Sequence, residues 1–315
     1  KLAGLLFDSL RNKIMPLNDD LILYPNHGAG SACGKNMSKE TTDTLGNQKK
    51  VNYALRADMT KEEFKEELLD GLSEPPGYFP QNVLLNIKGY DSFDKIMSKA
   101  QNPLSPKAFE FAANETEALV IDVRHQSDFI NGHIPRSIFI GIDGAFAPWV
   151  GALIVDVNQP ILLVSPEDRL EEVVTRLSRV GFDNVVGYLE GGFEAWKTAE
   201  MTYDTVTSIS AEEFEMTYPE NKSFVYDVRR EGEYLSEHIE GVHHTPLDYL
   251  NNHLSEFPDD NTFYIHCAGG YRSVIAASIL KSRGIHNLID IKGGYAAIKN
   301  TKISRTDFVC PSTMK

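Results

Sequence analysis

The residues best suited to chemistry lie in one short segment, residues 266–273, which reads His-Cys-Ala-Gly-Gly-Tyr-Arg-Ser. Cys267 provides a thiol whose ionised form is a strong nucleophile. The segment lies between an expected strand at residues 262–265 and an expected helix that begins near Ser273. A strand–loop–helix junction lies at the carboxyl edge of a parallel sheet, where α/β proteins bind ligands. We therefore predict that Cys267 is a catalytic nucleophile that holds a transferable group.

The loop after Cys267 is suited to holding an anion beside the sulfur. Its backbone amides can curl round one point in front of a helix N-terminus, and glycines permit the positive φ angles that such a curl needs. The helix dipole and the amides favour the thiolate, and Arg272 adds a cation with a fork of donors. We predict catalytic roles for Cys267 and Arg272 and a binding loop formed by Ala268, Gly269, Gly270, Tyr271 and Ser273. The alternative is a buried structural cysteine beside a glycine turn, because free cysteines are often core residues.

The elements that must position this loop belong to an internal repeat. Matching segments recur about 105 residues later along the chain, and the offset falls to about 102 near the end. The matching pairs are 104–110 with 209–215, 120–124 with 225–229, 133–134 with 238–239, Gly181 with Gly284, and 191–192 with 293–294. This period is too long for a solenoid, so we expect two whole domains, a first copy at residues 103–203 and a second copy at residues 204–315.

Each copy alternates expected strands and helices. The β-branched-rich runs predicted to be buried strands are 118–123, 161–164 and 185–189 in the first copy and 223–228, 262–265 and 288–291 in the second. Residues 171–180 and 273–283 read as amphipathic helices, and Ser210 with Glu213 as a capping box before another. Strands separated by helices predict an α/β fold with parallel sheets covered on both faces.

Composition limits the partners. The 315 residues carry 31 basic and 45 acidic side chains, a net charge of −14, which argues against nucleic acid or an anionic membrane. No apolar run approaches the roughly 18 residues of a membrane span, and no signal peptide is evident. Three cysteines are too few for a disulfide framework, so we expect a cytoplasmic protein with one working thiol.

The second copy resembles a rhodanese domain. The resemblance rests on Asp227-Val-Arg229, Glu233-Tyr234, His238-Ile239, the loop 267–272 and Gly293-Gly294. It implies a sulfurtransferase in which the Cys267 thiolate takes sulfane sulfur from thiosulfate or a low-molecular-weight persulfide and passes it to a thiol or cyanide. Four residues separate Cys267 from Arg272, one fewer than in the related dual-specificity phosphatases, so phosphatase is the weaker alternative.

The first copy resembles the same family but lacks this chemistry. Counting back from Gly181 places Val164 opposite Cys267, and the next five residues read Ser-Pro-Glu-Asp-Arg. The proline removes an amide donor and the two carboxylates would repel an anion, although Arg169 remains. We expect this copy to be an inactive, structural module.

Residues 1–102 resemble the C-terminal part of a metallo-β-lactamase-fold domain, and most closely that of proteins that fuse a persulfide dioxygenase to two rhodanese modules. The similar segments are 24–31, 33–35, 44–46 and Asn52. His27 matches a metal-site histidine of the wider fold, but one histidine cannot hold a metal, and the chain has no H-x-H-x-D-H cluster. We therefore expect a fragment of a longer protein, with iron bound only in the complete parent and no complete metal site here.

The resulting hypothesis is a sulfurtransferase of sulfide detoxification that needs no cofactor for the transfer itself. Its expected partners are a small sulfur donor and a thiol acceptor, with self-association plausible by the same resemblance and no nucleic acid or membrane involved. Two rivals remain: a non-catalytic rhodanese scaffold in a metallo-β-lactamase-superfamily hydrolase, and a complete metalloenzyme.

Overall fold

A computed structural model describes residues 1–25, 41–70, 78–221 and 224–310 of the chain. The chain divides into two compact units, Lys1–Pro75 and Pro76–Lys315. His27 and Cys33 lie outside the described residues, so the prediction made for His27 stays a prediction.

The first unit is mainly helical. Its elements are α1 (Leu2–Ser9), η1 (Leu10–Ile14), β1 (Ile22–Leu23), β2 (Asp43–Thr44), α2 (Leu45–Val51), η2 (Tyr53–Leu55) and α3 (Lys61–Leu69). β1 and β2 pair antiparallel. Leu45 and Phe64 are fully buried, and the Phe7 ring meets that of Phe64 edge to face at 5.4 Å. α3 starts at a capping box in which Thr60 and Glu63 satisfy each other's backbone amides.

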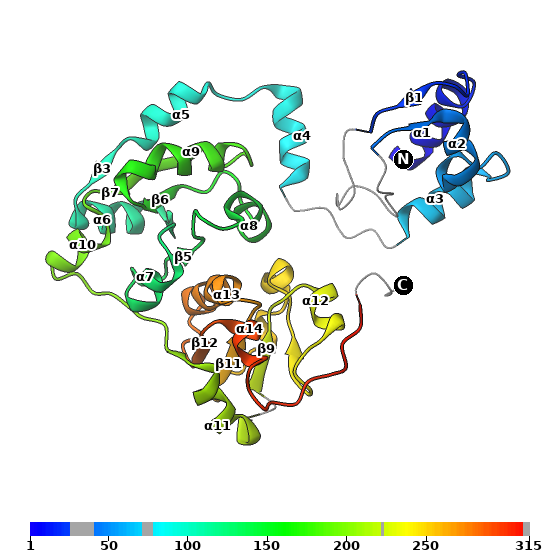
Figure 1. The fold of residues 1–315 in the computed structure, drawn as a ribbon. Coiled ribbons are helices and arrows are strands. Elements are labelled where there is room, and N and C mark those ends of the chain that lie inside the picture. The colour runs from blue at the N-terminus through cyan, green and yellow to red at the C-terminus, as the bar shows by residue number, and fades with distance from the viewer. Residues whose placement is uncertain (26–40, 71–77, 222–223, 311–315) are drawn as a thin grey trace. The chain divides into compact units, whose positions relative to one another are not determined.

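The second unit contains two five-stranded sheets, one in each copy of the repeat (Figure 1). The first copy follows α4 (Phe79–Lys88) and α5 (Phe93–Ala100), and α5 packs on β7 and α9. It comprises β3 (Pro103–Leu104), α6 (Pro106–Thr116), β4 (Leu119–Asp122), α7 (Gln126–Asn131), β5 (Ile138–Phe139), α8 (Phe146–Leu153), β6 (Ile161–Val164), η3 (Glu167–Arg169), α9 (Leu170–Ser178), β7 (Val185–Leu189) and α10 (Gly192–Thr198). Its strand order is β3-β7-β6-β4-β5.

The second copy repeats this arrangement. It comprises β8 (Ser208–Ile209), α11 (Ala211–Asn221), β9 (Val225–Asp227), α12 (Glu231–Ser236), β10 (His243–His244), η5 (Leu247–Asn252), η6 (Leu254–Glu256), β11 (Phe263–His266), α13 (Tyr271–Ser282), β12 (Leu288–Ile291) and α14 (Gly294–Ile298). The strand order, β10-β9-β11-β12-β8, is equivalent to that of the first copy, and neighbouring strands pair parallel in both sheets. The predicted α/β class with parallel sheets is confirmed.

Local signals in the sequence placed the six predicted strands of the two copies within two residues of their observed bounds. Strands β6, β7 and β12 have the expected bounds, and the Ser210–Glu213 capping box forms through bonds of 2.8 and 3.2 Å. The amphipathic pattern expected for α13 is wrong, because its residues from Ser273 to Leu280 are all buried. A helix that is buried all round needs partners on every side. α13 covers β11 and β12 of its own sheet and also packs on β5 of the first copy.

Candidate functional site

Cys267 lies directly after β11, the central strand of the second sheet, at its carboxyl end. Its side chain is buried, and the Gly270 N–H donates a hydrogen bond to its Sγ at 3.1 Å. Gly270 is the N-cap of α13 and has a φ of 98°, a left-handed conformation that glycine adopts without strain. The sulfur therefore faces a loop amide at the start of a helix, which favours negative charge on the sulfur.

The carbonyl groups of the loop are turned away from the sulfur by α14. The N–H of Tyr295 donates to the Cys267 oxygen at 2.6 Å, and the N–H of Ala296 donates to the Ala268 oxygen at 2.9 Å. Gly294 makes this approach possible, because a Cβ there would lie 2.3 Å from the Cys267 oxygen. With these carbonyls bound to α14, the loop amides are left to face an anion.

Arg272 does not present a free cation to the loop. Its guanidinium forms a two-bond ion pair with the Glu233 carboxylate, at 2.6 and 2.8 Å, and only 15% of its side chain is exposed. The hydrogen bonds from Arg272 lower the pKa of Glu233, although partial burial opposes the shift. Glu233 stands out in the sequence only as part of a family motif, and no local signal predicts its pairing with Arg272, 39 residues away. An anionic ligand must therefore share Arg272 with Glu233 or displace it.

Asp227 and Arg229 form a second, deeply buried ion pair beside the loop. Arg229 Nε lies 3.0 and 2.9 Å from the two Asp227 oxygens, and the Tyr295 ring covers the guanidinium at 3.8 Å. Burial alone would raise the pKa of Asp227, but His266 and Arg229 outweigh it and hold that pKa below its usual value. Arg229 also donates to the backbone carbonyl oxygen of Glu237 at 2.9 Å. The pair therefore has a structural role, because it connects the end of β9 to the backbone just after α12.

The remaining predicted residues take different positions. Ala268 is half-buried, Gly269 is exposed, and Ser273 is buried within α13. Tyr271 turns its side chain toward the first copy, where its hydroxyl donates to the Gly141 oxygen at 2.7 Å. The structure thus brings Cys267 and Gly270 together, while the side chains of Arg272 and Tyr271 are engaged elsewhere.

The equivalent loop of the first copy corrects one alignment. Asp122 pairs with Val164, and Asp227 pairs with His266, so Ser165 and not Val164 corresponds to Cys267. Counting back from a distant glycine failed because the first loop is shorter than the second. The Ser165 hydroxyl donates to the Pro166 oxygen at 2.9 Å, away from a nucleophilic role.

A carboxylate in the loop after β6 of the first copy binds the amide at the start of α10. The Gly191 N–H donates to Glu167 Oε1 at 3.0 Å. A pocket of about 430 Å³ opens here, lined by Arg124, Asp128, Asn131, Gly132, Ser165, Pro166, Gly191, Gly192, Phe193, Glu194 and Lys197. Its position matches that of the Cys267 loop, but it has no thiol.

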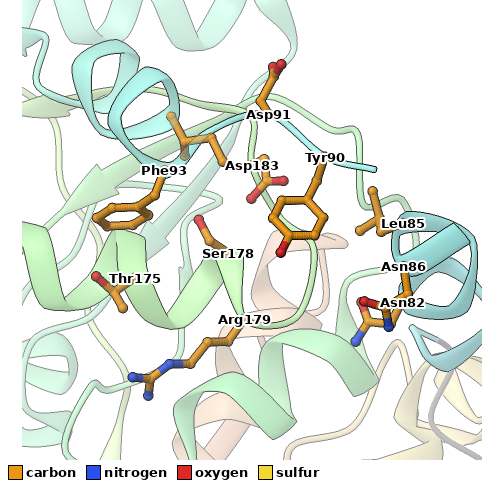
Figure 2. A pocket seen from close by; sticks show the side chains of 11 residues that line it. Asn82, Leu85, Asn86, Tyr90, Asp91, Phe93, Thr175, Ser178, Arg179 and Asp183 are labelled. Atoms are coloured by element: carbon orange, nitrogen blue, oxygen red, sulfur yellow. The ribbon is translucent and has the colours of Figure 1, made fainter. Parts of the chain in front are cut away.

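A further pocket of about 360 Å³ lies where α4, the segment before α5 and α9 meet (Figure 2). It is lined by Asn82, Leu85, Asn86, Tyr90, Asp91, Phe93, Ile96, Thr175, Ser178, Arg179 and Asp183. Burial raises the pKa of Asp183, whose Oδ1 has no hydrogen-bond partner. With no thiol among its lining residues, this pocket is a weaker candidate for nucleophilic chemistry than the Cys267 loop.

Metal ligands do not gather within the described residues, where no group of three or more His, Cys, Asp or Glu side chains is placed to hold an ion. In the same parts of the chain, no helix has the length and apolar character needed to span a bilayer.

Known proteins resemble the two copies. The rhodanese-like domain family matches residues 105–199 and 210–301. YrkF of Bacillus subtilis (strain 168) is 33% identical over 91 residues, which cover 29% of this chain and 49% of YrkF. YqhL of the same organism is 32% identical over 88 residues, covering 28% of this chain and 68% of YqhL. This chain therefore spans about half the length of the first of these relatives and about two thirds of the second.

A solved structure also resembles part of the chain. The crystal structure of a metallo-β-lactamase from Staphylococcus aureus subsp. aureus COL is 27% identical, with a TM-score of 0.44, and the match covers 59% of this chain and 49% of that one. A TM-score this low carries no conclusion about residues 1–102, so their assignment to that fold stays a prediction.

The packing of Gly294 predicts that its replacement damages the loop. Gly294→Ala places a methyl group against the Cys267 oxygen and forces a left-handed φ of 54° on alanine. Gly284→Ala is the matched control, because Gly284 has a φ of 91° with no atom within 4 Å of its Cβ position. Chemical denaturation should give a loss of about 1 kcal/mol for the control and about 2 kcal/mol more for Gly294→Ala. Equal losses would contradict the close approach.

The Arg272–Glu233 pair predicts a charge effect at Cys267. Glu233→Gln removes the carboxylate that neutralises Arg272, so anionic reagents should reach the sulfur more easily. We expect the ratio of alkylation rates with iodoacetate and iodoacetamide to rise roughly fivefold, since one charge at close range in water is worth about 1 kcal/mol. Peptide mass spectrometry would follow Cys267 specifically. Glu231→Gln, on the exposed side of the same helix, is the control, and an equal rise in both variants would contradict the pairing.

Proposed function

We propose that this chain, which belongs to the rhodanese-like domain family, is a sulfurtransferase that carries sulfane sulfur on Cys267. The observation that carries the proposal is the hydrogen bond from the Gly270 amide to Cys267 Sγ, at 3.1 Å, at the carboxyl end of the central strand. A thiolate there has an amide donor beside it and a helix N-terminus behind it. The same surroundings suit the anion of a persulfide formed on that sulfur.

The transfer takes place in two displacements. The Cys267 thiolate attacks the sulfane sulfur of the donor, and the bond between that sulfur and the rest of the donor breaks. The electron pair leaves with sulfite when the donor is thiosulfate, or with a thiolate when the donor is a persulfide. An acceptor thiolate or cyanide then attacks the outer sulfur of the Cys267 persulfide, giving an acceptor persulfide or thiocyanate and restoring the thiolate. No external oxidant or reductant is consumed, and no cofactor is required.

The loop residues have distinct roles in this scheme. The amide of Gly270 donates to the sulfur, and the loop carbonyls bound to α14 keep their negative ends away from it. Preorganised donors of this kind stabilise developing charge without a reorganisation cost. Arg272 assists an anionic donor to the extent that Glu233 releases it. The similarity to YrkF, which is described as a sulfur carrier protein, also supports a role in carrying sulfur.

The wider biological role extends this proposal. The resemblance of residues 1–102 to persulfide dioxygenase fusions suggests a cytoplasmic protein of sulfide detoxification, in which the transferase works beside an iron-dependent persulfide oxidation. A small persulfide or thiosulfate would be the donor, a low-molecular-weight thiol the acceptor, and self-association would follow by the same resemblance.

A second candidate, a non-catalytic scaffold, is favoured by the first copy. There the residue at the nucleophile's position is Ser165, and the Glu167 carboxylate accepts a hydrogen bond from the Gly191 amide at the start of α10. These observations make the first copy inactive in our proposal, but they do not extend to the second copy, where the thiol and the amide donor are both present.

The test is sulfur loading of Cys267. Wild-type protein treated with thiosulfate or a thiol persulfide under non-reducing conditions should gain one sulfur atom on the peptide that contains Cys267, and should turn over thiosulfate and cyanide. Cys267→Ser should lose both properties, while Cys310→Ser, a change in the exposed tail, should keep them. Undiminished turnover by Cys267→Ser would overturn the assignment, and repeated absence of the adduct in wild type would favour the scaffold.

A further inference from the structure

The catalytic loop of the second copy is anchored in the first copy through Tyr271. This residue follows Gly270, whose amide bonds the sulfur, and it begins α13. Its hydroxyl donates to the Gly141 oxygen at 2.7 Å, and its ring meets that of Phe139 edge to face, with centroids 5.7 Å apart. The anchor point is thus one residue away from the amide that contacts the nucleophile.

Two glycines of the segment that receives Tyr271 have no room for a side chain. A Cβ on Gly144 would lie 2.2 Å from the Tyr271 Cζ atom, and one on Gly141 would lie 3.1 Å from the same ring. Neither glycine has a positive φ, so the backbone conformation does not explain why glycine stands there. The close approach of the Tyr271 ring provides the physical reason at Gly144, whereas at Gly141 the Phe139 ring and the Arg124 carbonyl oxygen lie as close as Tyr271 does.

Arginines of the first copy hold the receiving segment in place. Arg169 binds Asp143 at 2.5 Å and also Glu172, and Arg176 donates to the Ile142 oxygen at 2.8 Å. Arg169 closes the silent loop, as Arg272 closes the catalytic loop. In the first copy, Arg169 binds Asp143 and so stabilises the segment that contacts Tyr271.

A second contact supports the same junction. The Phe139 N–H at the edge of the first sheet donates to Ser278 Oγ of α13 at 2.9 Å. α13 is therefore held to the first copy at Tyr271 in its first turn and at Ser278 two turns later. The helix whose N-terminus faces Cys267 cannot shift without breaking both contacts.

We propose that Tyr271 is a positioning residue through which the silent first copy holds the Gly270 amide against Cys267 Sγ. This rests on the sulfurtransferase function proposed above. An amide stabilises charge on sulfur only while its direction is maintained, and an unanchored loop would pay an entropic cost to regain it. The first copy, which has Ser165 at the position of Cys267, would then support the active site of the second.

The first test compares two tyrosines that each donate to a backbone carbonyl. Tyr271→Phe removes the bond to Gly141, whereas the control Tyr226→Phe removes a bond of 2.9 Å to Glu256 within the second copy. With thiosulfate and cyanide, Tyr271→Phe should lower kcat about tenfold and leave the KM for thiosulfate unchanged, a smaller effect than the loss of a direct donor. The control should keep kcat, and both variants should show similar thermal unfolding.

The second test asks whether Arg169 acts through Tyr271. Arg169→Gln should lower kcat in the wild-type background and have no further effect in Tyr271→Phe. Independent, multiplying effects would overturn the proposal, as would a wild-type kcat in Tyr271→Phe. A rise in the KM for thiosulfate with an unchanged kcat would also overturn it. So would a loss of kcat equal to that of Tyr226→Phe.

These outcomes are distinct from a failure of the proposed function. If that function is wrong, wild-type Cys267 gains no sulfur from any donor. If only the positioning role is wrong, wild type is active and Tyr271→Phe matches it.

Discussion

Hydrogen bonds between α14 and the loop after β11 are the contacts on which the site depends. Tyr295 and Ala296 bind the carbonyls of Cys267 and Ala268 and so fix the first two peptides of the loop, while the next N–H along the chain, that of Gly270, donates to the sulfur. This orientation needs the backbone of α14 to come within the space of a methyl group, and a glycine at 294 allows it. These bonds hold the loop in which the thiol, the helix N-terminus and the nearby ion pairs meet.

The two copies share the contacts that build their sheets but differ in the loop that would carry out the chemistry. Both copies keep a buried aspartate–arginine pair covered by an aromatic ring, Arg124 under Phe193 at 4.3 Å and Arg229 under Tyr295 at 3.8 Å. Both also stack a histidine on an aromatic ring one helical turn earlier, at 3.9 and 3.8 Å. These contacts maintain the sheet edge in each copy. The loops differ, with Ser165 at the position of Cys267, while the surrounding sheet has an equivalent strand order in both copies.

The second copy is not independent of the first. α13 is buried over its length because it packs on its own sheet and on β5 of the first copy. One hydrophobic core contains residues of both copies, among them Phe139, Phe146 and Ile275. Because the two copies share one core, a change in the core of the first copy also affects the packing of the second.

Apart from the repeat, which matching segments about 105 residues apart revealed, the sequence by itself determined what depends on local spacing: the positions of the predicted strands, the glycine loop and the position of Cys267 at a strand end. These features depend on residues a few positions apart, where backbone geometry leaves few choices. Tertiary structure alone decided the pairing of Arg272 with Glu233, 39 residues away, and of Tyr271 with Gly141, 130 residues away. It also decided that Ser165 replaces Cys267, because strand register is set by packing across the sheet and not by distance along the chain.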